Sequence, residues 1–145
     1  MITVMTALLL LAADHAAKAA VQYVMQLGET VPVIPHIFHR TYILNPGAAF
    51  GILEYQRIFF LGIVVILFAV YFWFRNRIPA HPVYFSIGIG LLLGGALGNA
   101  VDRWRLAGVV DFFDFRIWPI FNIADAGICV GVALIVFYFW RNSDL

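Results

Sequence analysis

The sequence reads Ile58-Phe-Phe-Leu-Gly-Ile-Val-Val-Ile-Leu-Phe-Ala-Val-Tyr-Phe-Trp-Phe74 between two arginines, Arg57 and Arg75, and no residue of this stretch carries a charge. A helix needs about 20 mostly apolar residues to cross the hydrocarbon core of a bilayer. An uncharged stretch of nearly that length, with a positive charge at each end, predicts a transmembrane helix. The fold class follows from this segment: a helical integral membrane protein.

Three other segments have the same character. The segment 83–100 is also free of charged residues, whereas 2–25 and 120–140 each carry polar residues at one end. Four spans require about 80 residues, which leaves too little chain for a separate soluble domain. We expect one polytopic membrane domain over residues 1–145, an all-α protein with helices near 2–25, 58–74, 83–100 and 120–140 and an extracytoplasmic β-type segment over 26–57.

The composition supports this fold class. Hydrophobic residues make up 63% of the chain and charged residues 12%, against about 45–50% and 25% in soluble domains. The net charge is +1 and Lys18 is the only lysine, so we expect no nucleic-acid partner. Cys129 is the only cysteine, which excludes an intrachain disulfide, and we expect it to pack within its span.

The N-terminal segment has an alternative interpretation. A cleavable signal peptide also has a short apolar core followed by small residues, as Leu8–Ala13 and the alanines after it do. Such peptides begin with a basic region, which is missing here. We therefore expect a retained span.

The segment 26–57 mixes β-branched and aromatic residues with prolines. Between Val31 and Ile43, Pro32 and Pro35 favour short edge-type strands over helix. Asn45-Pro-Gly47 is a turn signal, and Ala48–Leu53 is small and apolar, which suits a short helix lying at the membrane interface.

The orientation in the membrane is less clearly encoded. Arg75 and Arg77 lie in the short link between the second and third spans, and Arg141 follows the fourth. Aromatic residues gather at the same ends, as in an interfacial belt. This pattern predicts both termini and the link in the cytoplasm, although the opposite loops hold more arginines in total: Arg40, Arg57, Arg103, Arg105 and Arg116.

Glycines recur every four residues in the third span, at Gly90, Gly94 and Gly98. They share one helix face, which allows a neighbouring backbone to approach closely. We expect this stripe to serve helix packing, with Gly88 and Gly95 lying off it.

Polar residues collect at the end of the bundle opposite the two termini. Ionisable groups at membrane depth are costly and by default mark a functional site. Asp14 and Lys18 are four residues apart and can form an ion pair, and Asp102 precedes Arg103, so pairing with that arginine and a direct role at the site are equally open. The remaining members of this group are Asn45, Asn99, Asp111, Asp114, Asn122 and Asp125.

Asp111 and Asp125 are the candidates for a catalytic pair. Two carboxylates in a low-dielectric cleft share a proton, so one can activate water while the other polarises a carbonyl.

A proton- or cation-coupled transporter would use the same residue types, but no inverted repeat is visible. A structural membrane adaptor is the third possibility. No serine elbow, metal-binding histidine spacing or phosphate loop occurs in the sequence.

Five blocks, in order along the chain, resemble the signal peptidase II (lipoprotein signal peptidase) family, integral-membrane aspartic endopeptidases of bacteria. The blocks are Asp14-His-Ala-Ala-Lys18, Asn45-Pro-Gly-Ala-Ala-Phe50, Gly94-Gly-Ala-Leu-Gly-Asn-Ala-Val-Asp-Arg103, Val109-Val-Asp-Phe112 and Phe121-Asn-Ile-Ala-Asp125. One block alone would be weak, but five in order within a four-span pattern are specific.

The resemblance implies an endopeptidase that cuts diacylglyceryl-modified prolipoproteins on the amino side of the lipidated cysteine, with Asp111 and Asp125 as the catalytic pair. It implies that Asn45, Asn99, Asp102, Arg103 and Asn122 bind substrate or orient the pair, with Asp102 supporting Arg103, and that Asp14 and Lys18 stabilise the fold.

The resemblance also implies no metal or other cofactor and no obligatory protein partner. The expected partners are the lipidated substrate and membrane lipids. The expected location is the bacterial inner membrane, with both termini cytoplasmic and the active site near the outer face.

Overall fold

The computed structural model describes residues 1–47, 56–79 and 82–142. Its helices are α1 (Ile2–Val24), α2 (Arg57–Phe74), α3 (Val83–Leu106) and α4 (Ile123–Arg141), with a short 3-10 turn, η2 (Arg75–Arg77), after α2. All four helices are long and apolar enough to cross a membrane. The predicted interfacial helix at 48–53 lies outside the described residues.

Two predicted helix boundaries need correction. The third helix does not stop at 100 but continues to Leu106 and ends where Ala107 takes a left-handed conformation (φ 60°). Its last turns are polar, but the chain offers no helix breaker before this point, so Asp102 and Arg103 lie within the helix. The fourth helix begins at Ile123 rather than 120, because Asn122 caps it.

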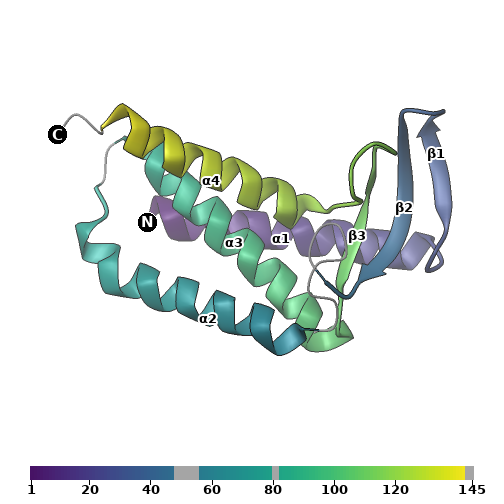
Figure 1. Ribbon diagram of the computed structural model, residues 1–145, viewed down its shortest axis with the longest axis horizontal. Coiled ribbons are helices and arrows are strands. Elements are labelled where there is room, and N and C mark those ends of the chain that lie inside the picture. The colour runs from purple at the N-terminus through teal and green to yellow at the C-terminus, as the bar shows by residue number, and fades with distance from the viewer. Residues whose placement is uncertain (48–55, 80–81, 143–145) are drawn as a thin grey trace.

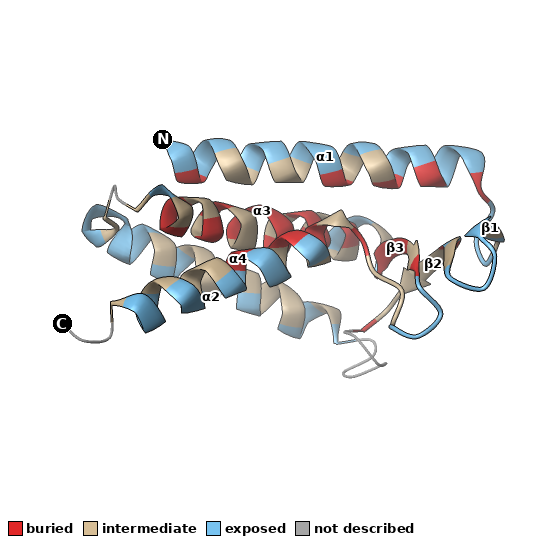
Figure 2. Ribbon diagram, turned by 90° about the horizontal axis from the view of Figure 1, so that it is seen from above, coloured by how far each residue is buried: buried red, intermediate tan, exposed pale blue. Residues whose placement is uncertain are grey.

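α3 lies at the centre of the bundle, between α1 and α4, and α2 packs against it from a further side (Figure 1). Figure 2 shows that buried residues gather on α3, whereas none of the described side chains of α2 is buried. The N-terminus of α1, the C-terminus of α4 and η2 lie at one end of the bundle, and the sheet lies at the other (Figure 1).

Glycines allow α3 to pack closely on two sides. A Cβ atom on Gly94 would lie 2.5 Å from the carbonyl oxygen of Ala7 on α1, and one on Gly95 would lie 2.5 Å from the carbonyl oxygen of Ala124 on α4. The predicted stripe is therefore a packing face toward α1. The glycines off the stripe form a second face, toward α4.

The sheet has three antiparallel strands in the order β1 (Thr30–Ile34), β2 (Phe38–Asn45) and β3 (Val109–Asp114). The first two strands fall in the segment where strands were predicted. The third strand lies between the predicted third and fourth spans, where the sequence predicts no strand. Val110 and Phe112 of β3 pack on Val21 and Met25 of α1, which fastens the sheet to the end of the bundle.

Candidate active site

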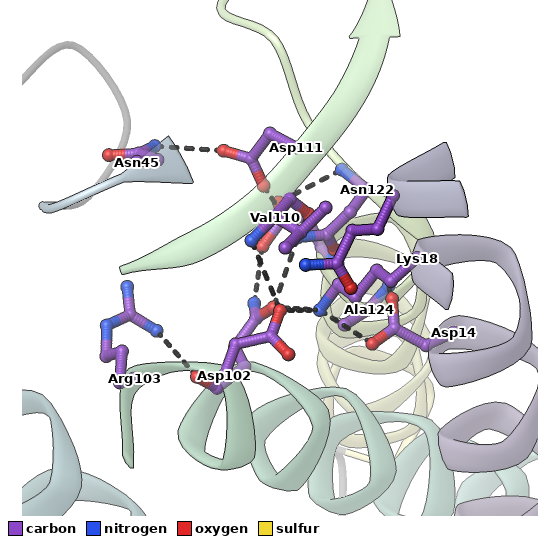
Figure 3. Close-up of polar contacts among 12 residues, drawn as sticks. Asp14, Lys18, Asn45, Asp102, Arg103, Val110, Asp111, Asn122 and Ala124 are labelled. Carbon is purple, nitrogen blue, oxygen red and sulfur yellow. Dashed lines mark hydrogen bonds and ion pairs between the residues drawn. The ribbon is translucent and has the colours of Figure 1, made fainter. Parts of the chain in front are cut away.

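Polar side chains from α1, α3, β2, β3 and α4 meet where the sheet joins the bundle (Figure 3). Along β3, successive side chains point to opposite faces. Val110 and Phe112 face the core formed with α1, so Asp111 between them points toward the other side. β2 pairs with β3, and the pairing of Ile43 with Asp111 brings the end of β2 next to this carboxylate.

Asp111 is almost fully buried, with 2% of its surface exposed. Asn122 donates a hydrogen bond from Nδ2 to Oδ1 of Asp111 (2.7 Å), and Asn45 donates from Nδ2 to Oδ2 (3.0 Å). Burial, and secondly the negative charge of Asp125, raise the pKa of Asp111 to about 7 against the lowering effects of the two amides and of Lys18. Asp111 therefore holds a proton far above the pH at which an ordinary aspartate loses it.

Asp125 lies in the first turn of α4. Asn99 donates from Nδ2 to Oδ1 of Asp125 (2.7 Å), and the backbone N–H of Asn122 donates to Oδ2 (3.3 Å). The Asp125 N–H in turn donates to Oδ1 of Asn122 (2.8 Å), which completes a capping box. Free N–H groups at a helix N-terminus favour a negative charge, so this position suits an ionised carboxylate.

Asn122 connects the two aspartates. Its buried side chain donates from Nδ2 to the Asp111 carboxylate and accepts at Oδ1 from the backbone N–H of Asp125, and its own backbone N–H donates to the Asp125 carboxylate. The side-chain amide also donates to Oδ1 of Asn99 (3.1 Å). One residue thereby fixes the positions of both carboxylates and of the amide that serves Asp125.

Lys18 lies at the centre of a second buried cluster, behind the aspartates. Its ammonium lies 2.7 Å from Oδ2 of Asp14 and 2.8 Å from Oδ2 of Asp102, and it donates to Oδ1 of Asn99 (3.1 Å). Asp14 also accepts from the backbone N–H of Ala124 (2.9 Å). The ion pair expected between Asp14 and Lys18 is present, and Asn99 links this cluster to Asp125.

The expected pairing of Asp102 with Arg103 needs correction. Asp102 binds Lys18 and accepts from the backbone N–H of Val110 (3.2 Å). The Arg103 guanidinium donates instead to the carbonyl oxygens of Gly47 (2.9 Å) and Asn99 (3.5 Å) and lies 4.4 Å from the ring centre of Phe60. Neighbouring helix positions point about 100° apart, so the two side chains face different partners.

A cavity of about 220 Å³ opens beside the two aspartates. The polar side chains of its wall come from Asn45, Asn99, Arg103, Asp111 and Asp125. The loop before α4 contributes Trp118 and the residues up to Phe121. The site therefore combines a buried and a half-buried carboxylate, a guanidinium and room for a small group of atoms next to them.

Cys129 and Ile128 also line this cavity, and Cys129 is exposed. The expectation that Cys129 only packs within its span is therefore wrong. Its distance of four residues from Asp125, which places both on one helix face, was the signal that could have identified it.

Asp114, the other acidic residue of the loop, lies outside the cavity. It accepts from the Thr41 hydroxyl (2.7 Å) and from the Arg116 guanidinium (3.1 Å). Burial raises the pKa of Asp114, but these hydrogen bonds outweigh that effect and lower it below its usual value. Asp114 holds the start of the loop that carries Trp118 to the cavity.

Within residues 1–47, 56–79 and 82–142, no group of three His, Cys, Asp or Glu side chains could hold a metal ion. His36 is exposed, and His39 is half-buried. The chemistry available to the described site therefore comes from carboxylates, amides and a guanidinium.

The fold and the site together define a class: a multi-pass membrane protein with paired aspartates beside a cavity at one end of its bundle. The family model for signal peptidase (SPase) II matches residues 6–141. The chain belongs to the signal peptidase II family.

Relatives and solved structures agree with this assignment. The chain is 49% identical to the lipoprotein signal peptidase of Pelotomaculum thermopropionicum over 90% of this chain and 86% of the relative. It is 41% identical to that of Halothermothrix orenii, over 95% and 94%. A bacterial membrane enzyme solved in meso at 2.3 Å is similar with a TM-score of 0.89 and 34% identity, over 97% of this chain and 88% of that one.

Proposed function

We propose that this chain removes the signal peptide from diacylglyceryl-modified prolipoproteins, cutting on the amino side of the lipidated cysteine with Asp111 and Asp125 as the catalytic pair. Family membership over residues 6–141 supports the activity. The observation that carries the assignment of the pair is the double contact of Asn122, whose side-chain amide donates to Asp111 and whose backbone N–H donates to Asp125, so that both carboxylates lie beside one cavity.

The two aspartates take different roles because their surroundings differ. Asp125 accepts hydrogen bonds at the N-terminus of α4, which supports its role as the ionised general base. The raised pKa of Asp111 supports its role as the protonated partner. A water molecule between them loses a proton to Asp125 while its oxygen attacks the scissile carbonyl carbon, and Asp111 gives its proton to the carbonyl oxygen.

The tetrahedral intermediate then breaks at the carbon–nitrogen bond. Asp125 passes its proton to the leaving amine, which becomes the new N-terminus of the lipidated cysteine. Asp111 recovers a proton from the hydroxyl as the carboxylic acid of the signal peptide forms. Each aspartate returns to its starting protonation state, so the cycle needs no further reactant.

The amides and the guanidinium serve positioning and binding. Asn45 and Asn122 hold Asp111, and Asn99 holds Asp125. Arg103, fixed against Gly47 and above Phe60, offers its charge to substrate carbonyl or ester oxygens at the cavity. The ion pairs of Lys18 with Asp14 and Asp102 connect α1 to α3 behind the site.

The proposed setting is the bacterial inner membrane, with both termini cytoplasmic and the cavity near the outer face. Arg75 and Arg77 at η2 and Arg141 at the end of α4 support this orientation, because positive residues in short loops are retained on the cytoplasmic side. The substrate then reaches the cavity from the outer leaflet, with its acyl chains among the membrane lipids.

The test is a cleavage assay in detergent, with a diacylglyceryl-modified prolipoprotein and its unlipidated form. We expect the wild type to shorten the lipidated substrate. We expect Asp111→Asn and Asp125→Asn each to lower kcat/KM at least about a thousandfold, because the loss of either carboxylate stops the proton transfers that the pair performs together. Glu29→Gln is the matched control, because it also replaces a carboxylate by an amide and Glu29 is not among the described residues that line the cavity; this variant retains activity.

The outcomes separate the alternatives. Equal cleavage of the unlipidated form would remove the lipid requirement, and full activity in either cavity variant would contradict the pair. An inert wild type would make ion flux through reconstituted vesicles the next measurement, since a coupled transporter would use the same carboxylates.

A further inference from the structure

We infer that Cys129, with Ile128, forms the inner floor of the substrate site and sets the size of the substrate residue on the amino side of the cut bond. This inference rests on the proposed function. The site in question is the cavity that holds the two aspartates and Arg103, and the cysteine matters as part of its wall.

The spacing on α4 places the floor. Asp125, Ile128 and Cys129 are related as i, i+3 and i+4, so they share one helix face, and all three line the cavity. α4 runs away from the sheet toward the end where its C-terminus lies (Figure 1). Cys129 therefore lies one turn, about 6 Å, deeper along the span than Asp125.

The other walls close the cavity on the sheet side. Trp118, Pro119 and Ile120 line it from the loop before α4, and Val109 lines it from β3. The volume of about 220 Å³ is below the range of about 300–1,000 Å³ usual for pockets that hold drug-sized ligands. The cavity is therefore smaller than a typical drug-sized pocket, and a bulkier residue in its wall would reduce the space beside the aspartates.

The direction of the bound substrate indicates which of its residues lies against Cys129 and Ile128. A signal peptide is the apolar part that enters the membrane, and the mature chain that follows the lipidated cysteine extends toward the aqueous side. With the cut bond at Asp111 and Asp125, the residues on the amino side extend along α4 past Cys129. A small thiol at this point admits a small substrate residue, whereas a larger wall residue would occupy that space.

The first test compares wall variants on substrates that carry Gly, Ala or Leu immediately before the lipidated cysteine. We expect Cys129→Phe to lower kcat/KM on the Ala substrate at least about tenfold and on the Gly substrate less. We expect Cys129→Gly to raise kcat/KM on the Leu substrate by a similar factor. This is the size of effect that one or two methylene groups have in an apolar pocket.

Val130→Phe is the matched control. Val130 is the neighbouring residue of the same helix, is 52% exposed and is not among the described residues that line the cavity. We expect Val130→Phe to leave the relative kcat/KM values for the Gly, Ala and Leu substrates unchanged. A general disturbance of α4 is thereby distinguished from a change in the cavity wall at Cys129.

The second test does not depend on turnover. Cys129 is the only thiol in the chain, so a membrane-permeant maleimide reports its accessibility directly. In the Asp125→Asn variant, saturating lipidated precursor slows labelling of Cys129 at least about fivefold. In the Cys129→Ala/Val130→Cys/Asp125→Asn control, the same precursor leaves the labelling rate unchanged.

The two tests distinguish the failure of the inference from that of the proposed function. If the wild type cleaves but both Cys129 variants keep its size preference, the inference is overturned and the function stands. Unchanged labelling of Cys129 with bound precursor overturns the inference as well. A wild type that cleaves none of the substrates overturns the proposed function.

Discussion

Asp111 is the residue whose protonation limits the proposed reaction at high pH. Its raised pKa, about 7, means that the required protonated form is present below that pH and is lost as the pH rises through it. We expect kcat/KM to fall about tenfold per pH unit above the apparent pKa of the pair. A profile of kcat/KM that stays flat to pH 9 would contradict this role.

Asn45, at the end of β2, also affects the pKa of Asp111. Its Nδ2 donates to Oδ2 of Asp111 (3.0 Å), and this hydrogen bond lowers the pKa of Asp111. In Asn45→Ala the donor is absent, so the pKa rises and the alkaline decline of kcat/KM moves to higher pH. The measurement is the paired pH profile of wild type and variant, in which an unmoved decline with a lower maximum would mean that Asn45 contacts substrate only.

At the level of elements, the contact between α1 and α3 depends on space at Gly94. In Gly94→Ala the new Cβ would lie 2.5 Å from the Ala7 carbonyl oxygen, so the two helix backbones must separate. We expect a loss of about 1–3 kcal/mol in the free energy of unfolding, measured as a lower thermal midpoint in detergent. Gly62→Ala on α2 is the control, since no described atom lies within 4 Å of its Cβ position, and it is expected to be neutral or slightly stabilising.

The buried ion cluster connects the same two helices. Lys18→Met removes the cation between Asp14 and Asp102 and leaves two carboxylates buried without their partner, at an expected cost of about 3–5 kcal/mol. Asp14→Asn in the Lys18→Met background removes one of these charges and restores part of the stability. Thermal unfolding of the single and double variants checks this, and a double variant less stable than Lys18→Met would contradict it.

The elements differ in how far the sequence specifies them. The four spans could be predicted because each depends on a local, mostly apolar run of sufficient length, of which Ile58–Phe74 is the uninterrupted example. The end of α3 could not be placed by polarity, because a helix continues through polar residues until a conformational stop such as Ala107. β3 escaped prediction because its partner strand, β2, lies some sixty residues away, and strand pairing over such a distance leaves no local signal.

The candidate site shows the same limit. Asp111 and Asp125 could be selected from their types and surroundings in the sequence, but the partner of Asp102 could not. The choice between Lys18 and Arg103 depends on how α1 crosses α3, which the tertiary packing decides. Cys129 was discounted because an apolar setting suggests packing, although its helical spacing from Asp125 indicated a shared face.

At the scale of the whole molecule, the two ends of the helix bundle differ in composition. η2 and the helix ends beside it carry arginines and aromatic residues, whereas the sheet and the cavity lie at the opposite end (Figure 1). If the cavity faces outward, a cysteine placed at the tip of the β1–β2 hairpin is accessible from the outside, and one placed in η2 only from the cytoplasm.

This topology can be measured with a membrane-impermeant maleimide in a Cys129→Ala background. Ile37 is 60% exposed at the hairpin tip, and Asn76 is exposed in η2, so Ile37→Cys and Asn76→Cys place one thiol at each end. We expect Ile37→Cys to react in intact spheroplasts and Asn76→Cys only in inside-out vesicles. The reverse pattern would place the aspartates on the cytoplasmic side and would contradict the proposed orientation.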